Sequence, residues 1–156
     1  MLNVFFSSSF FLHKTDTSGK EWSWTATLLC NRDAQIIIVA YNVTDRSSFE
    51  NCNRWISDVR EHSFHRAVVV AVGSWTDLKE HRKVEKDEAI KFFEERGIPP
   101  NHYFETSAKT GEGVNALFFG ALRFWLKQIE EKNVNAEQHA QLPTPDNPPQ
   151  KNCIIA

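Results

Sequence analysis

The stretch AQIIIVAYNV, residues 34–43, decides the fold of this chain. It is a near-continuous run of apolar and β-branched residues, which is typical of a strand buried on both faces in a parallel sheet. A second run of this kind, AVVVAV at residues 67–72, leads into the polar loop GSWTD at residues 73–77. The two runs and the segment between them predict an α/β fold, in which a polar loop at the carboxyl end of a strand binds ligands.

The segment between the two runs predicts a helix. Ser47 and Glu50 have the spacing of a capping box at its amino end. Four apolar residues then fall on one helical stripe: Phe49, Cys52, Ile56 and Val59.

Downstream, the pattern predicts two more helices with a strand between them. Residues 85–96 form the first helix, with Gly97 as its stop signal, and residues 102–106 form the strand. The final helix begins near Val114 and carries a broad apolar face, which indicates core packing rather than a cofactor site.

Composition limits the class of protein. A chain of 156 residues fits one domain, and a formal net charge of −2 gives no reason to expect nucleic acid as a partner. Cys30, Cys52 and Cys153 lack metal-ligand spacing and are too few for a disulfide framework, so a reducing cytosol is expected. Residues 1–12 have two interpretations, a strand with a serine turn or a secretory signal, although no basic residue precedes their apolar part.

Three motifs carry a family resemblance: YNVTDRSSFEN at residues 41–51, WI at 55–56 and ETSAKTG at 105–111. They strongly resemble the Rab branch of the small GTPases, over roughly residues 12–130. The resemblance implies an incomplete P-loop small-GTPase fold, with a mostly parallel sheet and helices on both faces. It also implies binding of GTP or GDP with Mg²⁺, and GTP hydrolysis in vesicle trafficking.

The resemblance assigns a guanine site to two separate segments. Asp77 matches the family residue that accepts two hydrogen bonds from the guanine N1 and N2 edge, and by itself it would be interpreted as a loop carboxylate or a helix cap. Ser107, Ala108 and Lys109 match the other half, in which the alanine amide binds guanine O6 and the lysine stem covers the ring. Ser74 and Trp75 depart from the family's asparagine and lysine, although the Trp75 ring can pack on a base.

The phosphate end of the family's site is represented by DTSGKE at residues 16–21. By resemblance, Asp16 holds Mg²⁺ through water and the Gly19 amide senses the γ-phosphate; taken alone, the segment is a strand-ending turn. Lys20 replaces the glutamine that orients the attacking water, and an ammonium group has no acceptor. We therefore expect impaired hydrolysis, and whether the chain is an enzyme stays open.

The family's first strand, P-loop and first switch have no counterpart in this sequence, which is therefore interpreted as an amino-terminally truncated relative. Nucleotide binding is expected to be weak or lost. The alternative is a nucleotide-independent pseudo-GTPase that binds Rab effectors or regulators through Trp22, Trp24 and the helix at residues 49–59. The absent strand is central in the family, so its neighbours must close up, or residues 1–12 must fill the gap.

The carboxyl-terminal segment differs in composition from the rest. Residues 1–133 are assigned to the small-GTPase-like domain, and the polar, proline-containing residues 134–156 to a disordered tail. The chain ends in CIIA, which fits prenylation of Cys153. One prenyl chain gives weak, reversible attachment, so we expect a cytoplasmic protein, peripheral on the cytosolic face of intracellular membranes.

Overall fold

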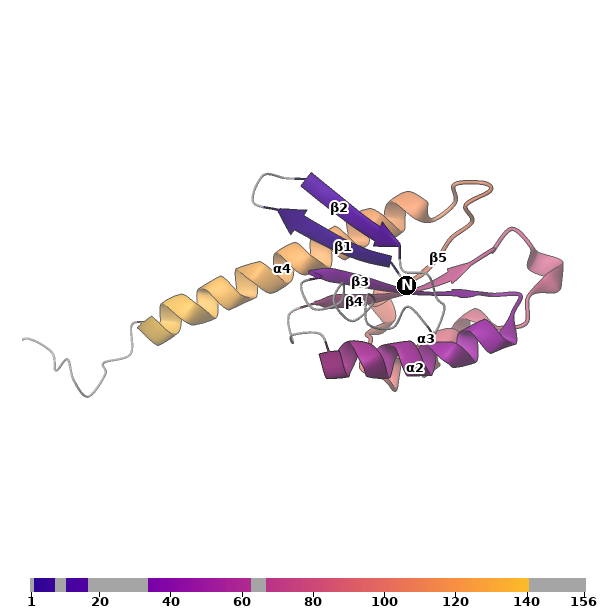
Figure 1. Ribbon diagram of the computed structural model, residues 1–156, viewed down its shortest axis with the longest axis horizontal. Helices are drawn as coiled ribbons and strands as arrows, with labels where there is room; N and C mark the ends of the chain where they lie inside the picture. The colour runs from indigo at the N-terminus through magenta and orange to yellow at the C-terminus, as the bar shows by residue number, and fades with distance from the viewer. Residues whose placement is uncertain (1, 8–10, 17–33, 63–66, 141–156) are drawn as a thin grey trace, which may run out of the picture. The chain divides into compact units, whose positions relative to one another are not determined.

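The computed structural model describes residues 2–7, 11–16, 34–62 and 67–140 (Figure 1). The chain separates into two compact units, Met1–Trp125 and Leu126–Ala156. The elements, in order, are β1 (Leu2–Ser7), β2 (Phe11–Asp16), β3 (Ile36–Asn42), α2 (Arg46–His62), β4 (Val68–Ser74), η2 (Lys79–His81), α3 (Lys86–Glu94), η3 (Pro100–His102), β5 (Tyr103–Glu105) and α4 (Val114–Ala140).

In the described residues the sheet has five strands, in the order β2-β1-β3-β4-β5. The two apolar runs form β3 and β4, which pair in parallel, and β5 joins β4 in parallel as well. Ile36 to Val39 and Tyr41 are all buried, as the run of apolar residues in β3 predicts. The α/β fold with a parallel core is thus confirmed, although the amino-terminal hairpin is antiparallel.

β1 is an interior strand of the described sheet. It lies between β2, which ends at Asp16, and β3, and it pairs antiparallel with both. Leu2, Asn3 and Val4 stand opposite Ile38, Ile37 and Ile36. The sequence left two possibilities: β2 and β3 pair directly, or residues 1–12 lie between them. The structure contains the second, because residues 2–7 form a strand that pairs with both.

Helices cover both faces of the parallel strands, as predicted (Figure 1). Because side chains alternate along a strand, β3 sends Ile37, Val39 and Tyr41 to the side of α2 and α3. Ile36 and Ile38 go to the opposite side, where they pack with Leu117 and Ala121 of α4.

The start of α2 differs from the predicted capping box. Asp45 caps the helix, because its Oδ1 accepts a hydrogen bond from the Ser47 amide at 3.0 Å. Glu50 does not reach back to the cap but pairs with Arg46 at 3.5 Å. The predicted capping box is therefore wrong, whereas the apolar stripe is confirmed, since Phe49, Cys52, Ile56 and Val59 are buried.

The last two helices follow the predicted pattern with one correction. α3 lies within residues 85–96, and its Ala89 and Phe93 are buried. α4 begins at Val114 as expected but continues through Ala140, so residues 134–140 are helical and the prediction of disorder there is wrong. Cys153 and the rest of the tail from residue 141 lie outside the described residues. Within the described part of the chain, no helix is long and apolar enough to cross a membrane.

Candidate functional site

Two loops meet at the carboxyl edge of the parallel sheet. One follows β4 and carries Trp75 and Asp77, and the other follows β5 and carries Ser107 to Lys109. The strands before them are neighbours, with Gly73 opposite Glu105. Backbone hydrogen bonds continue past the strands, from the Thr106 amide to the Gly73 carbonyl at 2.8 Å and from the Thr76 amide to the Thr106 carbonyl at 3.3 Å. The edge where open α/β sheets bind ligands is therefore built from these two loops.

A direct side-chain contact joins the loops. Ser107 is completely buried, and its Oγ donates a hydrogen bond to Asp77 Oδ1 at 2.7 Å. The same Oγ accepts a hydrogen bond from the Thr110 amide at 3.3 Å. The Asp77 carboxylate is thus held by a residue from the other loop. The structure brings together two of the residues that the sequence assigns to one guanine site; their role in binding stays a prediction.

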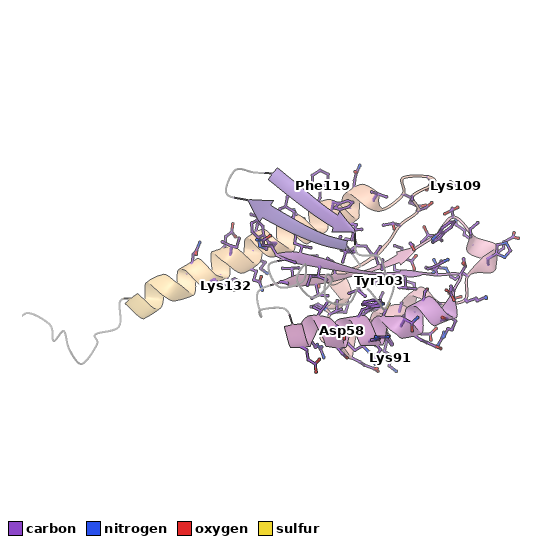
Figure 2. The ribbon with its side chains drawn as sticks, in the orientation of Figure 1. Asp58, Lys91, Tyr103, Lys109, Phe119 and Lys132 are labelled. Carbon is purple, nitrogen blue, oxygen red and sulfur yellow. The ribbon has the colours of Figure 1, made fainter. Side chains whose placement is uncertain are left out.

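The loop after β5 is closed on itself by backbone contacts. The Ser107 amide donates to the Glu112 carbonyl at 3.0 Å, and the Gly111 amide donates to the Ser107 carbonyl at 2.9 Å. Ala108 and Lys109 remain exposed on this loop, and Figure 2 places Lys109 on the connection between β5 and α4. Because Ser107 is buried whereas Ala108 and Lys109 are exposed, Ala108 and Lys109 are the residues of this loop segment that a ligand can reach.

The loop after β4 contains a residue with an unusual backbone conformation. Ser74 Oγ donates to the Tyr41 carbonyl at 2.6 Å, so it joins β4 to β3. Trp75 has a φ of 67°, in the left-handed region, and its side chain is 54% exposed. A bulky residue in this region is strained, and such residues gather at functional sites. The exposed and strained Trp75 thus lies two residues before Asp77, next to the candidate site.

Next to these loops lies a polar network that sequence reasoning missed. Arg82 binds Glu105 through two hydrogen bonds, Nη1 to Oε1 at 2.8 Å and Nη2 to Oε2 at 3.0 Å. The Tyr103 hydroxyl donates to Glu105 Oε1 at 3.0 Å and lies 2.8 Å from the Tyr41 hydroxyl. The sequence feature that could have indicated this network is Gly73 in β4, because a glycine inside a strand often marks a place where another group approaches the backbone closely.

The environment sets the charges in this network. Burial raises the pKa of Tyr41 to about 12 and raises the pKa of Tyr103 as well, so both hydroxyls keep their protons at neutral pH. Burial acts to raise the pKa of Glu105, but hydrogen bonds from Arg82 and Tyr103 outweigh it and hold that pKa below its usual value. Glu105 is therefore a carboxylate paired with the Arg82 guanidinium.

The predicted phosphate and metal residues are only partly described. Asp16 is the last residue of β2, but its side chain lies outside the described part, as do Gly19, Lys20, Trp22 and Trp24. Where side chains are described, no group of three or more His, Cys, Asp or Glu residues could hold a metal ion. The Mg²⁺ site therefore stays a prediction.

Comparison with known proteins adds an independent observation. Residues 4–127 match the Ras family. The chain is similar to Ras-related protein Rab-13 from Canis lupus familiaris, with 37% identity over 69% of this chain and 52% of that protein. It is 33% identical to Rab-13 from Bos taurus, over 90% of this chain and 70% of that protein, and 34% identical to human Rab-26, over 78% and 46%. The chain thus spans about half the length of several of these relatives.

Proposed function

This chain belongs to the Ras family as a Rab-type small GTPase, and from that premise we propose that it binds the base of a guanine nucleotide. Binding is weak and GTP hydrolysis is impaired in this proposal. The associated process is vesicle trafficking, the process implied by the resemblance to Rab proteins.

The contact between Ser107 and Asp77 carries the proposal. An ionised carboxylate has two acceptor oxygens, and Ser107 engages Oδ1 at 2.7 Å. The remaining acceptor capacity suits the two N–H donors on the N1 and N2 edge of guanine, which adenine does not offer. The exposed residues Ala108 and Lys109 follow on the same loop, in the places where the family contacts O6 and the ring.

Departures from the family residues support the reduced activity. Lys20 stands where the water-orienting glutamine is expected, and Trp75 where a lysine stem lies on the base. Mg²⁺, when bound, would neutralise phosphate charge, and Asp16 is the residue that we propose to hold it through water.

A thermal melt with GDP and with ADP tests this function. A ligand that binds only the native state at about 100 times its Kd adds about 2.7 kcal/mol, or roughly 5–11 °C in Tm for a chain of this size. We expect millimolar GDP to raise Tm and ADP to leave it unchanged. Equal shifts with GDP and ADP would contradict guanine selectivity.

Asp77→Asn sharpens the test. The amide keeps an oxygen for the Ser107 hydroxyl but places an NH₂ donor against the donors of guanine, so the GDP shift should disappear while the unliganded Tm changes little. Asp87→Asn, an exposed change in the first turn of α3, is the matched control and should retain the shift. Retention of the GDP shift by Asp77→Asn would exclude Asp77 from the site.

The exposed and strained Trp75 favours a second candidate, a nucleotide-independent interaction module. In it, the chain binds Rab effectors or regulators by its surface and associates with membranes through prenylated Cys153. It predicts a cooperative melt that neither GDP nor GTP changes, together with binding of a purified Rab regulator.

Incubation with a farnesyl donor and its transferase tests the proposed prenylation. It should add one prenyl mass to the chain and none to Cys153→Ser. A wild-type chain that stays unmodified would contradict the proposed membrane attachment.

A further inference from the structure

We propose that four side chains, Tyr41, Tyr103, Glu105 and Arg82, form a positioning device for the loop that carries Ser107. None of them belongs to the base site, and they act on it through the backbone. The effect on nucleotide affinity rests on the proposed function, whereas the effect on the loop does not.

The hydrogen bonds of the network have one consistent direction. Tyr103 donates its only hydroxyl hydrogen to Glu105 Oε1 at 3.0 Å. Tyr41 must therefore donate to the Tyr103 oxygen across their 2.8 Å contact. Glu105 also receives both Arg82 bonds, so a chain of donors runs from the core to the carboxylate. Such chains strengthen one another in a buried setting.

The sheet brings these groups together across a glycine. Tyr41 on β3 and Glu105 on β5 both stand opposite Gly73 on the strand between them. A Cβ at Gly73 would lie 2.9 Å from the Tyr103 hydroxyl and 3.0 Å from the Tyr41 hydroxyl. The absence of a side chain at Gly73 leaves room for the two hydroxyls to meet, and Figure 2 shows Tyr103 within the sheet.

The network reaches the binding loops through Glu105 and Arg82. Glu105 is the last residue of β5 and directly precedes the Thr106–Ser107 pair, while Arg82 follows the segment that contains Asp77. Arg82 is itself oriented by a hydrogen bond from its Nη1 to the Val84 carbonyl at 3.1 Å. The Arg82–Glu105 and Asp77–Ser107 contacts therefore join the same two chain segments at two points.

Burial makes the ion pair consequential for the loop. The side chains of Arg82 and Glu105 are 17% and 21% exposed, so loss of the cation leaves a largely buried carboxylate without its main donors. The simplest relief is movement of Glu105 toward water, which would pull on the loop that begins at the next residue. Tyr103 also limits this movement, because its hydroxyl donates to Glu105 Oε1 at 3.0 Å.

Amide hydrogen exchange measured by NMR on the unliganded full chain tests the proposal. Arg82→Met should speed exchange of the Thr106, Ser107 and Gly111 amides by roughly tenfold or more, because hydrogen bonds to charged groups are among the stronger ones. Val70 and Ala71 in the middle of β4 should keep their exchange rates. Tyr103→Phe removes one donor only and should give a smaller change at the same three amides.

Arg46→Met is the control, since it removes two other Arg–Glu contacts, with Glu88 of α3 at 2.6 Å and with Glu50 of α2 at 3.5 Å. It should leave the three loop amides unchanged. Unchanged loop exchange in Arg82→Met would overturn the proposal, and so would equal acceleration of the loop and β4 amides, which indicates a general stability effect.

A nucleotide titration adds a separate readout. If the wild-type chain binds GDP, Arg82→Met should weaken binding roughly tenfold while Arg46→Met does not, and equal affinity in Arg82→Met would count against the proposal. If the wild-type chain ignores GDP, the proposed function fails, and the exchange rates alone decide whether the network positions the loop.

Discussion

At the scale of single residues, the loop after β5 depends on two glycines that differ in their surroundings. Gly111 and Gly113 both have positive φ, 79° and 71°. A Cβ on Gly111 would meet nothing within 4 Å, whereas a Cβ on Gly113 would lie 2.0 Å from the Glu105 carbonyl oxygen. Residue 111 favours glycine only because of its positive φ. Residue 113 favours glycine because of its positive φ and because the Glu105 carbonyl lies too close to leave room for a Cβ.

This pair yields a prediction with an internal control. Gly111→Ala should lower the free energy of unfolding by about 1 kcal/mol, the cost of a left-handed alanine. Gly113→Ala should lower it by roughly 3 kcal/mol or more, because the loop must also move away from Glu105. Urea unfolding of both variants measures the difference, and equal losses would contradict the close approach at Gly113.

At the scale of elements, α4 is held against the sheet by contacts that tolerate little change. Phe104 of β5 fills the space above Gly120, where a Cβ would come within 2.5 Å of the phenylalanine ring. His102 stacks on Phe124 of α4 with ring centroids 3.9 Å apart, and its Nδ1 lies 3.1 Å from the Val69 carbonyl. These two contacts of the histidine connect η3 with both β4 and α4.

The His102 contact predicts sensitivity to acid. Burial lowers the pKa of His102 below its usual 6.5, and the hydrogen bond to Val69 offsets only part of this effect. The unfolded chain then binds more protons than the native one, so this contribution to stability is present above about pH 6.5 and is lost as pH falls through the lower, native pKa. Urea unfolding between pH 7 and pH 5 should show the loss.

His102→Asn isolates this contribution, because asparagine keeps a donor near the Nδ1 position but does not titrate. Its unfolding free energy should fall less between pH 7 and pH 5 than that of the wild type. His81→Asn, at an exposed residue of η2, should fall as much as the wild type. Identical slopes in all three proteins would exclude His102 as the source.

At the scale of the whole molecule, the first strand makes the sheet continuous. β1 pairs with β2 on one side and with β3 on the other, so it is an interior strand despite its place at the start of the described chain. Without it, β2 and β3 would each present unpaired backbone groups, which are a route to aggregation.

Asn3→Pro tests the interior position of β1. Proline cannot donate to a strand ladder, and in an interior strand it should lower the free energy of unfolding by about 1–3 kcal/mol, the cost of a buried group left unpaired, and promote aggregation. Asn3→Ala keeps the amide and should change stability much less. Thermal melts and size-exclusion chromatography measure both effects, and a melt of Asn3→Pro that matches Asn3→Ala would place β1 outside the sheet.

The sequence by itself determined the elements and the family, because those depend on patterns that are local or nearly so. The β-branched runs predicted β3 and β4, the apolar stripe predicted the buried face of α2, and two motifs about thirty residues apart indicated one site, consistent with the contact of Asp77 and Ser107. Only the tertiary structure decided which side chains meet across strands. Asp45 rather than Ser47 caps α2, because the helix begins at Arg46 and Asp45 is the residue directly before it. The hydroxyls of Tyr41 and Tyr103 meet over Gly73, and β1 enters the sheet antiparallel, because pairing partners in a sheet are chosen by the whole fold rather than by neighbouring residues.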